Sequence, residues 1–187
     1  MEIENYIIAD DHTFVERSLA GDDMAFEYLF NRYGDAMRRL FLQRSTSAED
    51  TEDLLQETFI KVYVNLHRYS PDYTFGQWVY AIARNTHIDF ERCRQENLSI
   101  DEKFAAPIAS TPSPEESLIS LQQRSQIEHY ISCLPEQYRT LFTMRFLEGY
   151  AYDEIAEKLR LPMGTVKTRI HRARERMCSL ILEGEKH

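Results

Sequence analysis

The chain of 187 residues carries 31 acidic and 22 basic side chains, so its formal net charge is −9 at neutral pH. This length can hold one large domain or two small ones, each able to bury a core without disulfides or metals. The first residues contain no basic segment followed by an apolar run, and no stretch of about eighteen apolar residues occurs, which argues against a signal peptide and a membrane-spanning helix. We therefore expect a soluble, cytoplasmic protein without direct insertion into a membrane.

The residue types of metal and catalytic sites do not occur in the spacings that such sites need. Cys93, Cys133 and Cys178 lie far apart, with no CxxC pair and no histidine at metal-binding spacing, so neither a disulfide framework nor a zinc site is indicated. The sequence also lacks a glycine-rich phosphate loop, a His/Glu metal pair and a nucleophile motif. We expect no catalytic residue, no metal and no cofactor.

Two long helices are predicted in the first part of the chain. Apolar positions recur with a helical period between residues 11 and 44, where Asp22 or Asp23 can cap a helix. Ser47 or Asp50 can open the next helix. Its apolar stripe comprises Leu54, Leu55, Thr58, Phe59, Val62, Tyr63 and Leu66. The other face, which is acidic and polar, carries Asp53, Gln56, Glu57 and Lys61. Composition alone favours a solvated face over a docking surface.

The segment 67–76 breaks the helical pattern at Pro71 and Gly76. It holds three aromatic rings, those of Tyr69, Tyr73 and Phe75. Such rings can pack over a small core, or they can stack on unpaired bases if they are exposed beside basic groups. A helix follows from 77 to 95, with Trp78 on its apolar face and with Arg84 and Asn85 elsewhere on it. For Trp78, a position in the core is favoured.

The helical pattern fails between residues 96 and 116, where three prolines, small residues and excess acid occur. This composition predicts a flexible linker. It separates a domain over residues 1–95 from a second domain over residues 117–187. No strand pattern is present, so we predict an all-α fold with two small helical domains.

A helix-turn-helix is predicted near the end of the chain. A helix from about Pro114 ends before Pro135, and another ends near Gly149. Residues 152–176 then form two short helices joined by a tight turn, which is the helix-turn-helix pattern. On a helical wheel the second of these buries Val166, Ile170, Ala173 and Met177.

The outward face of that last helix is polar and basic. It carries Gly164, Thr165, Thr168, His171 and Arg172, with Lys167, Arg169, Arg174 and Arg176 on its flanks. Small polar residues with a basic collar suit the major groove of DNA, where bases are contacted at the centre and phosphates at the edges. The alternative is a solvated basic helix, and the coincidence of turn and charge favours DNA. Residues 1–70 hold seven basic and fourteen acidic side chains, so we expect a protein partner to help bring the chain to DNA.

Two motifs resemble a known family. LPEQYRTLFTMRFLEGYAYDEIAEKLRLPMGTVKTRIHRARERM resembles the fourth domain of a bacterial extracytoplasmic-function (ECF) sigma factor. The runs DLLQETFIKVYVNLHRY and FGQWVYAIARNTHIDFERCR resemble its second domain. The resemblance spans most of the chain and implies a protein without catalysis that binds core RNA polymerase, directs it to a promoter and helps to open the duplex.

The resemblance also implies roles for individual residues. The polymerase-docking helix of the family is matched by Asp53, Leu54, Gln56, Glu57, Phe59 and Lys61. Capture of flipped bases of the melted minus-ten strand is implied for Tyr69, Tyr73, Phe75, Trp78, Arg84 and Asn85. Reading of the duplex minus-thirty-five element is implied for Lys167, Thr168, His171 and Arg172, and the helical wheel adds Thr165, Arg169 and Arg174 as DNA contacts. Members of the family are commonly held inactive by an anti-sigma factor, which is a possible further partner.

A simple helix-turn-helix regulator with a sensing or interaction domain at its front is the main alternative. It accounts for residues 135–178, but it leaves the aromatic segment and the front motif unexplained. An enzyme is a more distant alternative, because no catalytic motif supports it.

Overall fold

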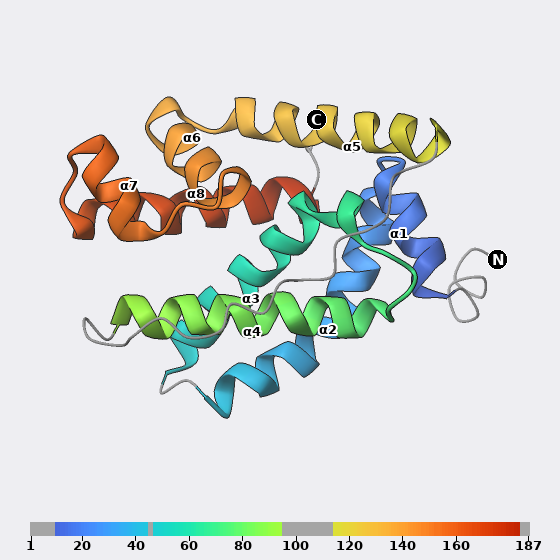
Figure 1. Cartoon of the computed structure of the whole chain (residues 1–187), viewed down its shortest axis with the longest axis horizontal. Helices are drawn as coiled ribbons and strands as arrows, with labels where there is room; N and C mark the ends of the chain where they lie inside the picture. Colours follow the sequence, from blue (N-terminus) through green and yellow to red (C-terminus); the bar gives the residue numbers. More distant parts are fainter. Residues whose placement is uncertain (1–9, 45–46, 95–113, 184–187) are drawn as a thin grey trace.

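The computed structural model describes residues 10–44, 47–94 and 114–183, and every regular element in these ranges is helical (Figure 1). The prediction of an all-α fold is therefore confirmed. The predicted linker lies outside the described residues except for its last three positions, which open a helix. The elements are α1 (Asp11–Leu19), α2 (Asp23–Leu42), α3 (Ala48–Val64), η2 (Leu66–Arg68), α4 (Phe75–Arg94), α5 (Pro114–Cys133), α6 (Glu136–Phe142), η3 (Thr143–Leu147), α7 (Tyr152–Leu159) and α8 (Met163–Glu183).

The starts of α2 and α3 follow from their capping residues. The Asp22 carboxylate accepts a hydrogen bond from the Ala25 N–H at 3.2 Å, and the Ser47 hydroxyl accepts one from the Asp50 N–H at 3.0 Å. Each cap satisfies a backbone donor that the first helical turn leaves without a partner. The sequence had left two capping candidates open for each helix, and the structure selects Asp22 and Ser47.

The core of the first region is built around α3, which packs against α2 and α4. Every member of its predicted apolar stripe is buried. Phe26 of α2 meets Tyr63 edge-on with ring centroids 4.7 Å apart, and Phe30 lies 4.4 Å from Phe59. Each large apolar side chain buried in this way contributes about 1.5–3 kcal/mol to folding.

The second region comprises α5 to α8, with α6 packed along α8. Here α6 continues into the π-helical turn η3, in which the Glu148 N–H bonds the Thr143 carbonyl at 3.0 Å. Gly149 then ends the turn with a φ of +79°, a conformation that costs glycine little. Arg160 closes α7 in the left-handed region at φ +51°, and the short turn to α8 follows.

Helix α5 connects the two regions. It lies along α8 at one end and contacts α1 at the other (Figure 1). Its Gln123 side chain donates to the Tyr63 carbonyl at 2.8 Å, and Tyr130 and Gln126 both donate to the Asp23 carboxylate. Burial raises the pKa of Asp23, and the hydrogen bonds from Tyr130 and Gln126 oppose that rise. The two regions are thus packed on one another.

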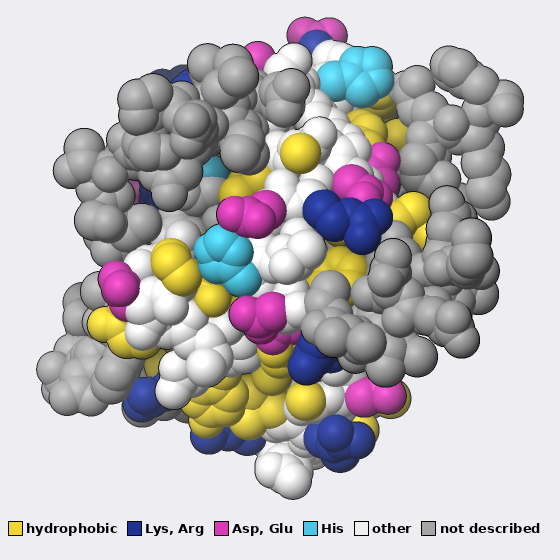
Figure 2. Space-filling view, turned by 90° about the vertical axis from the view of Figure 1, so that its right-hand side faces the viewer, with side chains coloured by type: hydrophobic (Ala, Val, Ile, Leu, Met, Phe, Trp, Pro, Cys, Tyr) yellow, Lys and Arg dark blue, Asp and Glu magenta, His cyan; other side chains and the backbone are white. Residues whose placement is uncertain are grey.

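The surface around α1 mixes side chains of both charges. Figure 2 shows acidic, basic and histidine side chains interspersed with hydrophobic ones among the described residues of that face. A face of this kind attracts phosphates weakly, because its charges of opposite sign offset one another. In the described ranges no helix has the length and hydropathy needed to cross a membrane.

Candidate functional site

The inner face of α8 agrees with the helical wheel. Val166, Ile170, Ala173 and Met177 are all fully buried. They hold the helix against α6 and the other helices of the second region, which fixes the direction of the outward side chains. The predicted helix-turn-helix is confirmed: Pro162 ends the turn between α7 and α8, and its carbonyl accepts from the Thr165 and Val166 N–H groups.

The proposed DNA contacts on α8 differ in exposure. Lys167, Thr168 and Arg172 are exposed, and the Thr168 hydroxyl donates to the Gly164 carbonyl at 2.9 Å. Thr165, Arg169 and His171 are half-buried. Arg174 is buried, with 4% of its side chain exposed. Six of the seven predicted contacts therefore reach the surface, and Arg174 faces the first region.

The aromatic segment consists of packed rings and one exposed ring. Trp78 is 2% exposed, which confirms the core position favoured from sequence. Tyr69 lies 5.5 Å from Phe75 and 5.6 Å from Trp78 between ring centroids, and its hydroxyl donates to the Tyr73 carbonyl at 2.7 Å. The Tyr73 ring itself is 46% exposed. The Tyr73 ring is thus exposed enough for a nucleobase to stack on it. The hydrogen bond from the Tyr69 hydroxyl to the Tyr73 carbonyl holds the backbone of Tyr73 in place.

Phe75 corrects the expectation of an aromatic loop. It is the first residue of α4, two positions before the predicted start, and it is 1% exposed. Its ring contacts Tyr33 as well as Trp78, because Gly76 brings the backbone close to the Tyr33 ring. In this structure Phe75 supports the segment and does not offer a face to a base. Arg84 and Asn85 are half-buried on α4.

The polymerase-docking residues predicted on α3 are distributed around the helix. Leu54 and Phe59 are each 2% exposed and belong to the core. The polar face carries Asp53, Gln56 and Lys61, which are half-buried, and Glu57, which is buried. The default expectation of a solvated face is wrong for this arrangement, because η3, α7 and α8 of the second region cover it.

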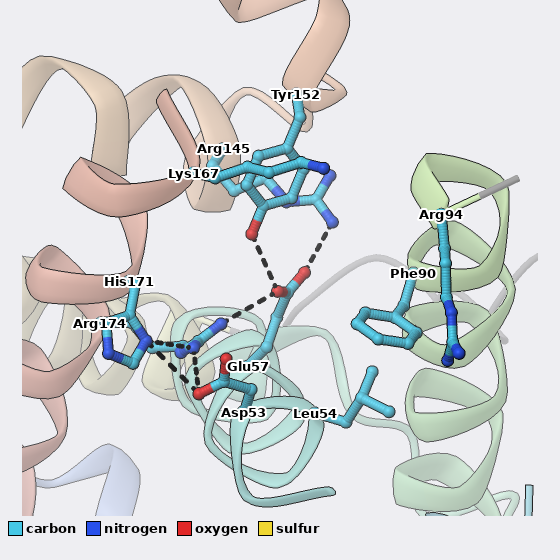
Figure 3. Close-up of a pocket in the computed structure, with 10 residues that line it drawn as sticks. All are labelled: Asp53, Leu54, Glu57, Phe90, Arg94, Arg145, Tyr152, Lys167, His171 and Arg174. Atoms are coloured by element: carbon cyan, nitrogen blue, oxygen red, sulfur yellow. Dashed lines mark hydrogen bonds and ion pairs between the residues drawn. The ribbon is translucent and has the colours of Figure 1, made fainter. Parts of the chain in front are cut away.

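Glu57 is the centre of a buried ion cluster between the two regions (Figure 3). One of its oxygens, Oε1, lies 2.6 Å from Arg145 Nη2 and 3.1 Å from Lys61 Nζ. The other, Oε2, accepts from the Tyr152 hydroxyl at 3.3 Å and lies 3.5 Å from Arg174 Nη1. Both oxygens therefore have partners from the second region.

Asp53, one turn before Glu57, extends the cluster toward α8. Its Oδ1 lies 2.6 Å from Arg174 Nη2 and 3.4 Å from His171 Nδ1. On the other side, Asp89 of α4 lies 3.7 Å from both Lys61 Nζ and Arg145 Nη2. Three carboxylates thus face three Lys or Arg side chains.

The protonation states follow from this geometry. Burial alone would raise the pKa of Glu57, but Lys61, Arg145 and Arg174 outweigh burial and hold that pKa well below its usual range. For Lys61, burial lowers the pKa, and Glu57 counteracts part of that effect. Burial would also lower the pKa of Arg145, but Glu57 raises it, so the guanidinium stays charged. The pair of Glu57 and Arg145 is therefore an ion pair at neutral pH.

Arg145, Tyr152 and Asp89 had not been predicted as site residues. Arg145 did carry a signal, since it is the one charge in the apolar run from Leu141 to Leu147. A buried arginine needs a paired carboxylate. The sequence does not say which of its acids lies opposite, because Glu57 precedes Arg145 by 88 residues.

A cavity of about 170 Å³ opens beside the cluster, between α3, α4, η3, α7 and α8. The side chains around it are Asp53, Leu54, Glu57, Phe90, Arg94, Arg145, Tyr152, Lys167, His171 and Arg174. Figure 3 shows Phe90 and Arg94 of α4 across the cavity from α8. The two regions therefore touch through paired charges with open space beside them. Within the described ranges no group of three His, Cys, Asp or Glu side chains is arranged to hold a metal ion.

Comparison with known proteins gives matches over both regions. The family model for sigma-70 region 2 matches residues 29–97, and the one for sigma-70 region 4 matches residues 124–177. The ECF RNA polymerase sigma factor SigW of Bacillus subtilis is 34% identical over 164 residues, which cover 83% of this chain and 88% of SigW. The ECF RNA polymerase sigma-E factor of Haemophilus influenzae is 34% identical over 174 residues, covering 88% and 92% of the two chains.

Solved structures also match. SigE of Rhodobacter sphaeroides, in complex with the anti-sigma ChrR, is 21% identical with a TM-score of 0.41, and the match covers 90% of this chain and 97% of that one.

Proposed function

The chain belongs to the ECF family of RNA polymerase sigma factors, and on this premise we propose that it binds core RNA polymerase and directs it to specific promoters. The observation that carries the proposal is the order of two family regions along one chain, the second of which contains a helix-turn-helix with a basic outer face. The protein initiates transcription by positioning other molecules and has no chemistry of its own. It acts in the cytoplasm, where polymerase and DNA are found.

The first region binds the polymerase through α3. Asp53, Gln56 and Glu57 give this helix an acidic polar face, which suits a basic surface on the partner. Leu54 and Phe59 support that face from the core. Lys61 forms an i, i+4 pair with Glu57 and fixes the direction of its carboxylate.

The aromatic segment captures bases from the melted minus-ten strand. Flipping a base out of the stack costs a few kcal/mol, and stacking on an aromatic ring returns about 1–3 kcal/mol per base. Tyr73 offers its exposed ring, while Tyr69, Phe75 and Trp78 hold it in place. Arg84 and Asn85, farther along α4, contribute polar contacts to the strand. Opening of the duplex then needs no hydrolysis of ATP.

The helix α8 contacts the minus-thirty-five element in the major groove. Thr168 and Arg172 lie on its outward face and contact base edges, and Lys167 and Arg169 beside them hold phosphates. Thr165 lies near the start of the helix, where backbone N–H groups favour an anion. His171 and Arg174 can contact DNA only after they leave Asp53. An anti-sigma factor is a further candidate partner through membership of the family.

Run-off transcription tests the proposal. Core polymerase with this protein should give a discrete transcript from promoter templates selected from a genomic library, whereas core polymerase alone should not. A helix-turn-helix regulator would bind DNA without supporting transcription by core polymerase alone. The match to sigma-70 region 2 favours the sigma factor, because a simple regulator leaves that region unexplained.

A further inference from the structure

The cavity beside the ion cluster has more basic than acidic side chains in its wall. The basic ones are Arg94, Arg145, Lys167 and Arg174, and the acidic ones are Asp53 and Glu57. The proposed function does not use this space. We infer that it is a binding site for a small phosphorylated molecule that carries a flat apolar ring.

The buried acid in the wall already has cationic partners. Glu57 lies within 3.5 Å of nitrogen atoms of Lys61, Arg145 and Arg174. Lys167, by contrast, has no ion-pair partner among the described residues. An anion that enters the cavity therefore meets a carboxylate whose charge is neutralised and an ammonium group whose charge is not.

Two buried arginines in the wall also have a donor without an acceptor. The side chains of Arg145 and Arg174 are 5% and 4% exposed. Their Nε atoms have no hydrogen-bond acceptor among the described residues. A buried donor in this state destabilises the protein, and phosphate oxygens are strong acceptors for guanidinium groups. The polar part of the wall therefore suits a phosphate.

The apolar part of the wall is formed by Phe90 and Leu54. Figure 3 shows Phe90 and Arg94 on one side of the open space and Lys167 and Arg145 on the other. The cavity measures about 170 Å³, and an apolar cavity of about 150 Å³ accepts a benzene ring. A single aromatic ring can therefore pack beside Phe90 while its phosphate reaches the basic side chains.

A ligand in this position contacts both regions of the chain. Phe90 and Arg94 belong to α4, whereas Arg145 belongs to η3 and Lys167 to α8. Because the site is formed only when these elements are folded and packed together, a bound ligand stabilises the folded protein by mass action. The melting temperature should therefore rise with the concentration of the ligand.

Isothermal titration calorimetry of the full-length protein with phenyl phosphate tests the inference. We expect saturable binding at one site, together with a rise in melting temperature. Inorganic phosphate should bind about fivefold or more weakly, because it buries no apolar ring. Arg94→Gln should weaken the binding of phenyl phosphate about tenfold, because it removes a charge-assisted hydrogen bond. Phe90→Leu should weaken the binding of phenyl phosphate and leave that of inorganic phosphate unchanged.

Arg92→Gln is the matched control, because Arg92 lies on the same helix as Arg94 but does not border the cavity. Its affinity for phenyl phosphate should equal that of the wild type. Arg94 is 46% exposed, so its variant should fold, and circular dichroism checks this. Absence of saturable binding would overturn the inference. Equal losses in Arg92→Gln and Arg94→Gln would also overturn it, because they indicate a general attraction of anions to the surface. The titration contains neither polymerase nor DNA, so its failure differs from failure of the proposed function in run-off transcription.

Discussion

Glu57 Oε1 and Arg145 Nη2 lie 2.6 Å apart, although 88 residues separate them in the chain. This pair connects a helix of sigma-70 region 2 to the π-helical turn η3 of region 4. A π-helical turn often marks a functional position in a helix. Here it carries the one arginine of an otherwise apolar segment to the acidic face of α3.

The first prediction concerns the pH dependence of this pair. Substitution of Glu57 by Gln should lower the free energy of unfolding by about 3–5 kcal/mol at neutral pH, because it removes the buried carboxylate that Lys61, Arg145 and Arg174 share and leaves only Asp53 and Asp89 opposite them. The pKa of Glu57 is lowered below its ordinary value of 4.5 by Lys61, Arg145 and Arg174. The stabilisation is therefore fully present above about pH 4.5 and is lost as the pH falls toward the lower pKa of the folded state.

Urea denaturation of both proteins over a pH series measures this difference. The gap in free energy between wild type and Glu57→Gln should narrow below about pH 4.5. Glu52→Gln is the control, since Glu52 pairs with Arg38 at the surface and should change stability by about 0–1 kcal/mol. A gap that stays constant down to acid pH would contradict the ionised state of Glu57.

Substitution by alanine should change the stability of the protein in opposite directions at two glycines. Gly149 has a φ of +79°, so Gly149→Ala should destabilise the protein by about 1 kcal/mol through the backbone alone. Gly34 lies inside α2, where a Cβ added to it would meet no neighbouring side chain within 4 Å, so Gly34→Ala should stabilise by about 0.5–1 kcal/mol. Thermal melting measures both changes. A stabilising Gly149→Ala would show that the turn after η3 does not need the left-handed conformation.

Much of the fold follows from local signals in the sequence. The caps Asp22 and Ser47, the buried stripe of α3 and the inner face of α8 all depend on residues within a few positions of one another. The helix-turn-helix was predictable for the same reason. Its Arg160 in the left-handed region was not, because an arginine has no special preference for that conformation.

The candidate site was predictable only in part, because exposure depends on distant partners. In the sequence, Phe75 stands in a segment that breaks the helical pattern, but contacts with Tyr33 and Trp78 bury its ring. Arg174 has the position of a phosphate contact on the helical wheel, but Asp53 binds it from the other region. Helical periodicity describes one helix at a time. It therefore does not reveal which face a second region covers.

The aromatic segment gives a third prediction, in which two neighbouring residues affect different measurements. Trp78→Ala should lower the free energy of unfolding by about 3–5 kcal/mol, because it leaves a cavity in the core. Tyr73→Ala should melt like the wild type, since its ring is 46% exposed. It should nevertheless reduce affinity for an unpaired minus-ten strand by about 1–3 kcal/mol.

Thermal melting and open-complex formation on duplex and pre-melted promoters separate these effects. Tyr80→Ala is a matched control, because Tyr80 is a similarly exposed tyrosine of α4 outside the predicted base contacts. If Tyr73→Ala melts early, or opens duplex promoters as well as the wild type does, the ring of Tyr73 only packs.

The fourth prediction distinguishes two exposed cations of α8. Arg172 lies on the outward face, so loss of its bidentate contact in Arg172→Ala should cost about 1–3 kcal/mol at one base pair and relax specificity there. Lys167 lies on the flank, so Lys167→Ala should weaken binding to all sequences alike and reduce the dependence of affinity on salt. Binding of the polymerase holoenzyme to a library of minus-thirty-five variants measures both profiles. Because the two side chains project from the same rigid helix, a shift of the helix would change both profiles together. Equal, sequence-independent losses for the two variants would therefore remove Arg172 from the base contacts.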